Sequence, residues 1–134
     1  MLGNAGTQTL TFSLIMIADE ESDGVIRKNI FYEVASAALS GLLLSFISFT
    51  VTILFIIFNP SLSENPYLFA SIVGISVLIS LIIGTFFSAL IPVLIHKVGL
   101  DPASASGPLL TTVIDISTIL TYYGIATWMI GVIL

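Results

Sequence analysis

A single acidic residue lies deep inside the last apolar segment of the chain. Asp115 follows Pro108 by seven residues, and no other charged side chain occurs between 108 and 134. On an α-helix its polar neighbours form one stripe, made of Thr111, Asp115, Thr118 and Tyr122. An ionisable group inside a membrane is costly and usually faces a water-filled path or a bundle interior. Two interpretations stay open: Asp115 serves an ion or proton path, or it is protonated and joins two helices by a hydrogen bond.

Other side chains that can bind cations lie near the ends of apolar segments. Glu33 begins the second such segment, as either a solvated acid or a cation ligand. An acidic run is either a solvated loop or a funnel that concentrates cations, and it comprises Asp19, Glu20, Glu21 and Asp23. His96 is the only histidine and there is no cysteine, so we expect no zinc or copper site. Carboxylates, hydroxyls and carbonyls instead suit Mg²⁺, Ca²⁺ or Mn²⁺.

The composition indicates an integral membrane protein. Of 134 residues, 57% are hydrophobic and only 8% are charged, whereas a soluble domain carries about 25% charged residues. Three basic residues are too few to form a positively charged surface that binds the phosphates of a nucleic acid, so we expect no nucleic-acid partner. The sequence holds no Ser-His-Asp arrangement, P-loop or dinucleotide fingerprint, and no enzymatic activity is expected.

Four apolar segments must position these side chains. They cover residues 2–18, 30–58, 67–95 and 108–134, and the last three exceed the roughly 20 residues that a helix needs to cross a bilayer. Unpaired backbone groups are costly in lipid, so we predict an all-α bundle of three full transmembrane helices and a partial one at the N-terminus. We interpret the first segment as the end of a spanning helix, with a re-entrant segment as the alternative.

The basic residues predict the orientation of the bundle. Arg27 and Lys28 lie in the loop 19–29 and Lys97 lies in the loop 96–107, while the loop 59–66 has no basic residue. Of the three crossings after the first loop, two separate it from the third loop, so these loops share one side, which the distribution of basic residues predicts to be cytoplasmic. The loop 59–66 and the C-terminus are then expected outside the cytoplasm.

Small residues recur every four positions along the third segment. They are Ser76, Ser80, Gly84 and Ser88. Small side chains at this spacing let helix backbones approach closely, so we expect this stripe to pack against other helices.

Three motifs, in order, resemble the transmembrane domain of the MgtE magnesium transporters and of related eukaryotic carriers. They are GNAGTQTLT (3–11), LDPASASGP (100–108) and TTVID (111–115). The resemblance extends from residue 3 to the C-terminus, so the whole chain is expected to be one such domain, corresponding to helices two to five of a five-helix domain. It implies a homodimer in the cell membrane, with an ion path at the subunit interface lined by the first and last helices of this chain.

The resemblance also implies roles for particular residues. Asp115 and Thr111 correspond to the family's Mg²⁺-binding positions on the last helix, and Gly3 and Asn4 to path positions on the first. A second pair, Asp101 and Glu33, resembles cytoplasmic-side acids that meet cations near the pore mouth. Mg²⁺ is then the transported ion and no catalytic cofactor is implied.

The chain departs from the family in three respects. The first helix is absent, so a missing N-terminal portion or a second transmembrane half is expected in the native protein. No cytoplasmic regulatory domain is present, and Thr118 stands where the family usually has glycine. Mg²⁺ transport is the leading prediction; a Na⁺- or H⁺-coupled cation carrier with Asp115 as its coupling site, and a non-transporting subunit, are the alternatives.

Overall fold

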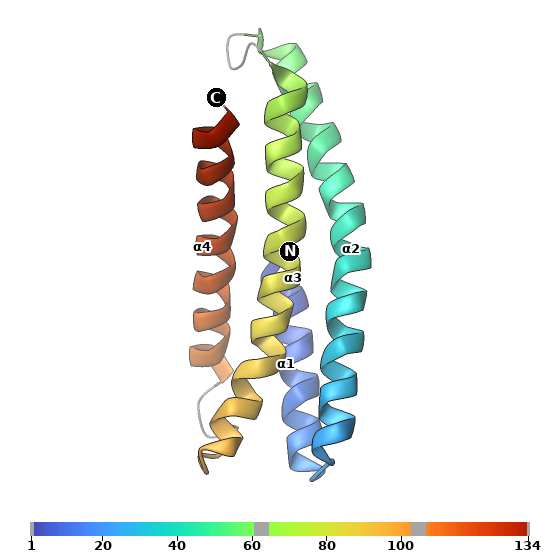
Figure 1. The fold of residues 1–134 in the computed structure, drawn as a ribbon, viewed down its shortest axis with the longest axis vertical. Helices are drawn as coiled ribbons and strands as arrows, with labels where there is room; N and C mark the ends of the chain where they lie inside the picture. The colour runs from blue at the N-terminus through green and yellow to red at the C-terminus, as the bar shows by residue number, and fades with distance from the viewer. Residues whose placement is uncertain (1, 61–64, 103–106, 134) are drawn as a thin grey trace.

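The architecture is an all-α bundle, as predicted. A computed structural model of the chain describes residues 2–60, 65–102 and 107–133. Those residues form four helices and no strand: α1 (Leu2–Ala18), α2 (Asp23–Phe58), α3 (Pro66–Lys97) and α4 (Gly107–Ile133). Successive helices run in opposite directions along the long axis, and α1 reaches only part of the height of the others (Figure 1). Three helices, α2, α3 and α4, are long and apolar enough to cross a membrane.

The start of α2 differs from the sequence prediction. The helix was expected from residue 30 and begins at Asp23, so the predicted loop 19–29 is reduced to residues 19–22. Apolar patterning marks where a membrane segment begins, whereas a helix continues through charged residues that favour it. Arg27 and Lys28 have high helix propensity, and Asp23 in the first turn is favourable at the positive end of the helix dipole. The remaining bounds agree with the prediction to within two residues.

The helix α3 occupies the centre of the bundle. It packs against α1, α2 and α4. The predicted small-residue stripe is buried along it, with Ser76, Ser80 and Ser88 fully inaccessible and Gly84 buried beside α4. On the other side, α2 crosses at Gly41 and Ser45, which lie against Leu78 and Gly74 of α3. The predicted close packing of this segment is confirmed.

The three basic residues of the chain gather at one end of the bundle. Arg27 and Lys28 lie near the start of α2, and Lys97 is the last residue of α3. An ion pair of 3.7 Å joins Lys97 Nζ to Asp23 Oδ2, which brings these two helix ends together. The end of α2, the start of α3 and the end of α4 lie at the opposite end (Figure 1).

Two helices, α1 and α3, end in the same hydrogen-bonded motif. In α1, Glu21 N–H donates to the Met16 carbonyl and Glu20 N–H donates to the Ile17 carbonyl. In α3 the equivalent donors are Leu100 and Gly99. The residue that turns the chain has positive φ in each case, +53° at Glu20 and +82° at Gly99. This is the Schellman arrangement, in which glycine is the favoured residue.

Removing the glycine of one turn and introducing a glycine into the other are predicted to have opposite effects on stability. Gly99→Ala is expected to lower the free energy of unfolding by about 1 kcal/mol, because an alanine is strained at positive φ. Its Cβ would meet nothing within 4 Å, so the cost is conformational only. Glu20→Gly is expected to raise the free energy of unfolding by up to about 1 kcal/mol, since it relieves that strain. Unfolding in detergent, followed by circular dichroism, measures both; equal stability of all three proteins would contradict the prediction.

Candidate ion-binding site

The carboxylate of Asp115 lies at the edge of the packed face of α4. That face consists of Leu110, Ile114 and Thr118, which are 1–3% exposed. Asp115 and Thr111 are half-buried beside it. Asp115 is eight residues from the start of α4, which places it about 12 Å along the helix. An acid is therefore held inside the apolar part of the bundle while part of its surface stays accessible.

No described residue forms an ion pair with Asp115. The ion pair found in the described ranges is the one between Lys97 and Asp23, at the end of the bundle. A buried charge without a partner is costly unless a proton or a bound cation neutralises it. Because the basic residues lie at the ends of α2 and α3, neutralisation of Asp115 by one of them is not expected.

The helix α1 approaches α4 closely beside this acid. Leu10 forms a buried cluster with Leu110 and Ile114, the residue before Asp115. One turn earlier, a Cβ on Gly6 would lie 2.8 Å from Ser88 Oγ and 2.9 Å from Ile114 Cγ2. Both distances are too short for a real side chain, so the glycine of the first motif is what allows α1 to fit between α3 and α4.

The polar residues of α1 divide between two faces. Thr9 and Ser13 are buried in the bundle, whereas Thr7, Gln8 and Thr11 are exposed on the outer side. The exposed face carries a shallow hollow of about 300 Å³. The predicted site residues Gly3 and Asn4 belong to the first turn of α1, and their side chains lie outside what the structure describes.

The sequence suggested that Glu33 lies at the start of a helix, but the structure places it further along α2. It is the eleventh residue of α2, and its half-buried carboxylate accepts a hydrogen bond of 2.7 Å from Thr9 Oγ1 of α1. The prediction was wrong about its place because α2 starts earlier than its apolar part. Sequence reasoning also missed Thr9 as a contact residue. Threonines in apolar helices commonly bond to their own backbone, as Thr11 and Thr118 do here, and no spacing distinguishes Thr9 from them.

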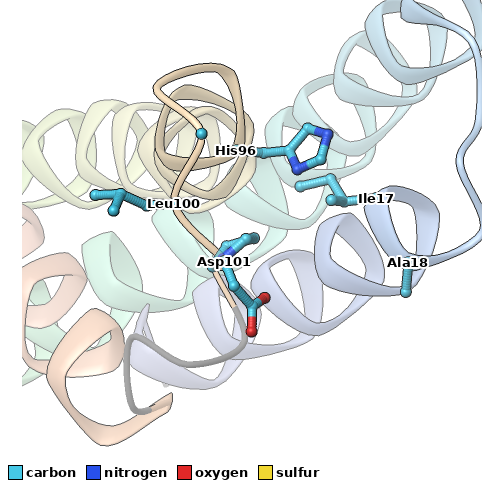
Figure 2. A pocket seen from close by; sticks show the side chains of 7 residues that line it. Ile17, Ala18, His96, Leu100 and Asp101 are labelled. Carbon is cyan, nitrogen blue, oxygen red and sulfur yellow. The ribbon is translucent and has the colours of Figure 1, made fainter.

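Asp101 lies at the basic end of the bundle. It is exposed just beyond α3 and helps to line a pocket of about 360 Å³ between the ends of α1 and α3. Figure 2 shows His96 and Asp101 extending to the same side, toward Ile17 and Ala18 of α1. The pocket offers a carboxylate and an imidazole at one end of the protein.

The predicted metal ligands are spread over the chain. Asp115 is on α4, Glu33 is on α2, and Asp101 follows α3. Within the described ranges, no three His, Cys, Asp or Glu side chains lie close enough together to hold a metal ion. Mg²⁺ keeps several of its waters and is commonly bound through one or two carboxylates, so separated acids are compatible with a hydrated ion that passes along the bundle.

Thr118 packs against α3 at the position where the resemblance leads one to expect glycine. Its side chain is 3% exposed, and its hydroxyl donates to the Ile114 carbonyl at 2.8 Å. A Cβ on Gly84 would lie only 2.6 Å from Thr118 Oγ1. The threonine therefore fills the notch left by Gly84, and its effect is on helix packing.

Comparison with known proteins identifies one family. The family profile of MgtE, described as a divalent cation transporter, matches residues 1–125. Two proteins named magnesium transporter MgtE are similar to the chain: that of Bacillus subtilis (strain 168) is 37% identical over 95% of the chain, and that of Enterococcus faecalis is 32% identical over 93%. A third, from Thermus thermophilus, is 27% identical over 92%. The chain spans about a quarter of the length of these relatives. No solved structure gives a significant match.

Proposed function

Because the chain belongs to the MgtE family of divalent cation transporters, we propose that it carries Mg²⁺ across a membrane with Asp115 as the central ligand. The observation that carries this proposal is the half-buried carboxylate of Asp115, which no described residue neutralises. A divalent cation compensates such a charge directly. The related proteins named magnesium transporters make Mg²⁺ the leading candidate.

The donor set on α4 suits a hydrated cation. Thr111 lies one turn before Asp115 on the same side of the helix and is also half-buried. A hydroxyl and a carboxylate are hard oxygen ligands, and Mg²⁺ loses its waters reluctantly. We therefore propose that Asp115 contacts the ion largely through retained water, with Thr111 as a neutral neighbour.

We propose that two copies of the chain form the path between them. One carboxylate per copy gives two negative charges, which match the charge of Mg²⁺. The outer face of α1 supports this arrangement, because Thr7, Gln8 and Thr11 are exposed on it. Polar side chains are unfavourable against lipid, and a water-filled interface would solvate them. Gly3 and Asn4 belong to the same helix and are proposed to face this path.

We propose Asp101 as a cation contact at the basic end of the bundle. For Asp101, the pocket shared with His96 would let cations collect beside the end of α1. The carboxylate of Glu33 lies farther along α2 and already accepts a hydrogen bond from Thr9.

Mg²⁺ flux into liposomes that contain the purified chain tests the proposed function. A fluorescent Mg²⁺ indicator trapped inside should respond in the presence of the protein and not in empty liposomes. Flux that requires an imposed Na⁺ or H⁺ gradient would favour a coupled carrier. An absence of flux from folded, reconstituted protein would favour a non-transporting subunit.

We propose that the basic end of the bundle faces the cytoplasm. The chain has no native cysteine, so a single introduced cysteine shows on which side of the membrane its position lies, without labelling of native thiols. Ser22→Cys and Val98→Cys should react with an impermeant maleimide only from the cytoplasmic side, and Pro60→Cys only from the opposite side. All three positions are exposed. Labelling of Pro60→Cys from the cytoplasm alone would reverse the orientation.

A further inference from the structure

Polar side chains of α1 and α2 form hydrogen bonds that join the two helices. Thr9 Oγ1 donates to Glu33 Oε2 at 2.7 Å, and Asn29 Nδ2 donates to Met16 Sδ at 3.3 Å. The Thr9 side chain is only 2% exposed and Glu33 is half-buried. Hydrogen bonds to a carboxylate are stronger than those between neutral groups, and burial protects them from competing water.

A continuous series of contacts connects this hydrogen bond to the candidate ion ligand. Thr9 directly precedes Leu10, and Leu10 packs against Ile114 of α4. The residue after Ile114 is Asp115. A helix moves as a stiff unit, so a shift of Thr9 moves Leu10 with it and displaces the part of α4 that carries Asp115. In this way Glu33 on α2 is linked to the position of Asp115.

We propose that Glu33 is a positioning residue: its hydrogen bond with Thr9 fixes α1 against α4 and thereby sets the place of the Asp115 carboxylate. The inference rests on the proposed function, and it gives Glu33 a role other than that of a cation ligand. A cation ligand must carry negative charge, whereas a positioning residue needs only an oxygen that accepts the Thr9 hydroxyl. This difference makes the two roles separable.

Four variants separate the hydrogen bond from the charge. Thr9→Val and Glu33→Ala remove the bond, while Thr9→Ser and Glu33→Gln keep a donor and an acceptor. Loss of a group that orients a metal ligand commonly lowers affinity or activity by 10–100-fold, so we expect the first pair to lower Mg²⁺ flux by about 10-fold. The second pair should retain near-native flux. The double variant Thr9→Val/Glu33→Ala should be no slower than either single variant, because both remove the same bond.

The series includes a matched control variant, and either of two outcomes would overturn the inference about Glu33. Ser13→Ala removes another buried hydroxyl of α1, one turn further on, and should leave flux unchanged. If Glu33→Gln is as slow as Glu33→Ala while Thr9→Val transports normally, Glu33 acts through its charge and the inference is wrong. Native flux in all four variants would overturn it equally.

Cross-linking supplies a readout that does not depend on transport. A cysteine pair at Met16 and Asn29 would join α1 to α2, since the two native side chains touch. Thr9→Val should slow disulfide formation in this pair several-fold and Thr9→Ser should not, provided that the hydrogen bond holds α1 in place. An unchanged rate in Thr9→Val would overturn the inference. If the proposed Mg²⁺ transport itself fails, this measurement still decides whether Glu33 positions α1.

Discussion

Asp115→Asn is expected to abolish Mg²⁺ flux while leaving the protein folded. Asparagine has nearly the volume of aspartate and still forms hydrogen bonds, so the packing at the edge of α4 is retained. The negative charge is lost from a site where no described side chain supplies another. Mutation of a residue that merely orients a metal ligand costs 10–100-fold, so removal of the ligand's charge should cost at least about 100-fold. Indicator-loaded liposomes measure this loss.

The same substitution separates transport from helix packing. If Asp115 were protonated and served only to join helices, asparagine could take over its hydrogen bond and flux would be unchanged. Elution volume and thermal melting of the purified variant establish that it is folded. Thr111→Ala is the matched control on the same side of α4, and a milder loss is expected because water readily replaces a neutral ligand. Native flux in folded Asp115→Asn protein would refute the assignment.

The number and type of the helices could be predicted from the sequence because the membrane imposes a simple rule. A long, continuously apolar segment that crosses lipid satisfies its backbone groups as a helix, and α3 and α4 end within two residues of their predicted bounds. The start of α2 could not be predicted in this way, because residues 23–29 are polar and helical at once. That error also misplaced Glu33, which was expected at the helix start and lies in its third turn.

Contacts between helices were less predictable than the helices themselves. The spacing of Ser76, Ser80, Gly84 and Ser88 predicted a packed face, and that face is buried. The spacing gives no information about which residue fills each gap. From the sequence, Thr118 in place of the family's glycine could either narrow the path or alter packing, and its place beside Gly84 explains how the bundle accommodates it. For the candidate site, the sequence indicates which residues suit a cation, while their grouping depends on how α1 and α4 meet.

Gly84→Ala is expected to destabilise the bundle through a clash with Thr118. The new Cβ would lie 2.6 Å from Thr118 Oγ1, far inside normal contact distance. The hydroxyl is held by its bond to the Ile114 carbonyl in a fully packed interface, so it cannot move aside without loss. Overpacking of this kind typically costs 1–3 kcal/mol, and we expect a loss of about 2 kcal/mol in the free energy of unfolding. Unfolding in detergent with increasing denaturant measures it.

A double-mutant cycle ties that loss to one contact. Thr118→Ala removes Oγ1 and leaves only the Cβ, which would lie 3.5 Å from the alanine Cβ at position 84, an ordinary contact. Gly84→Ala should therefore cost much less in the Thr118→Ala background, with a coupling energy of about 1–2 kcal/mol. Gly131→Ala is the control on α4, since its Cβ would meet nothing within 4 Å, and no destabilisation is expected. Additive effects at positions 84 and 118 would mean that the strain of Gly84→Ala arises elsewhere in α3.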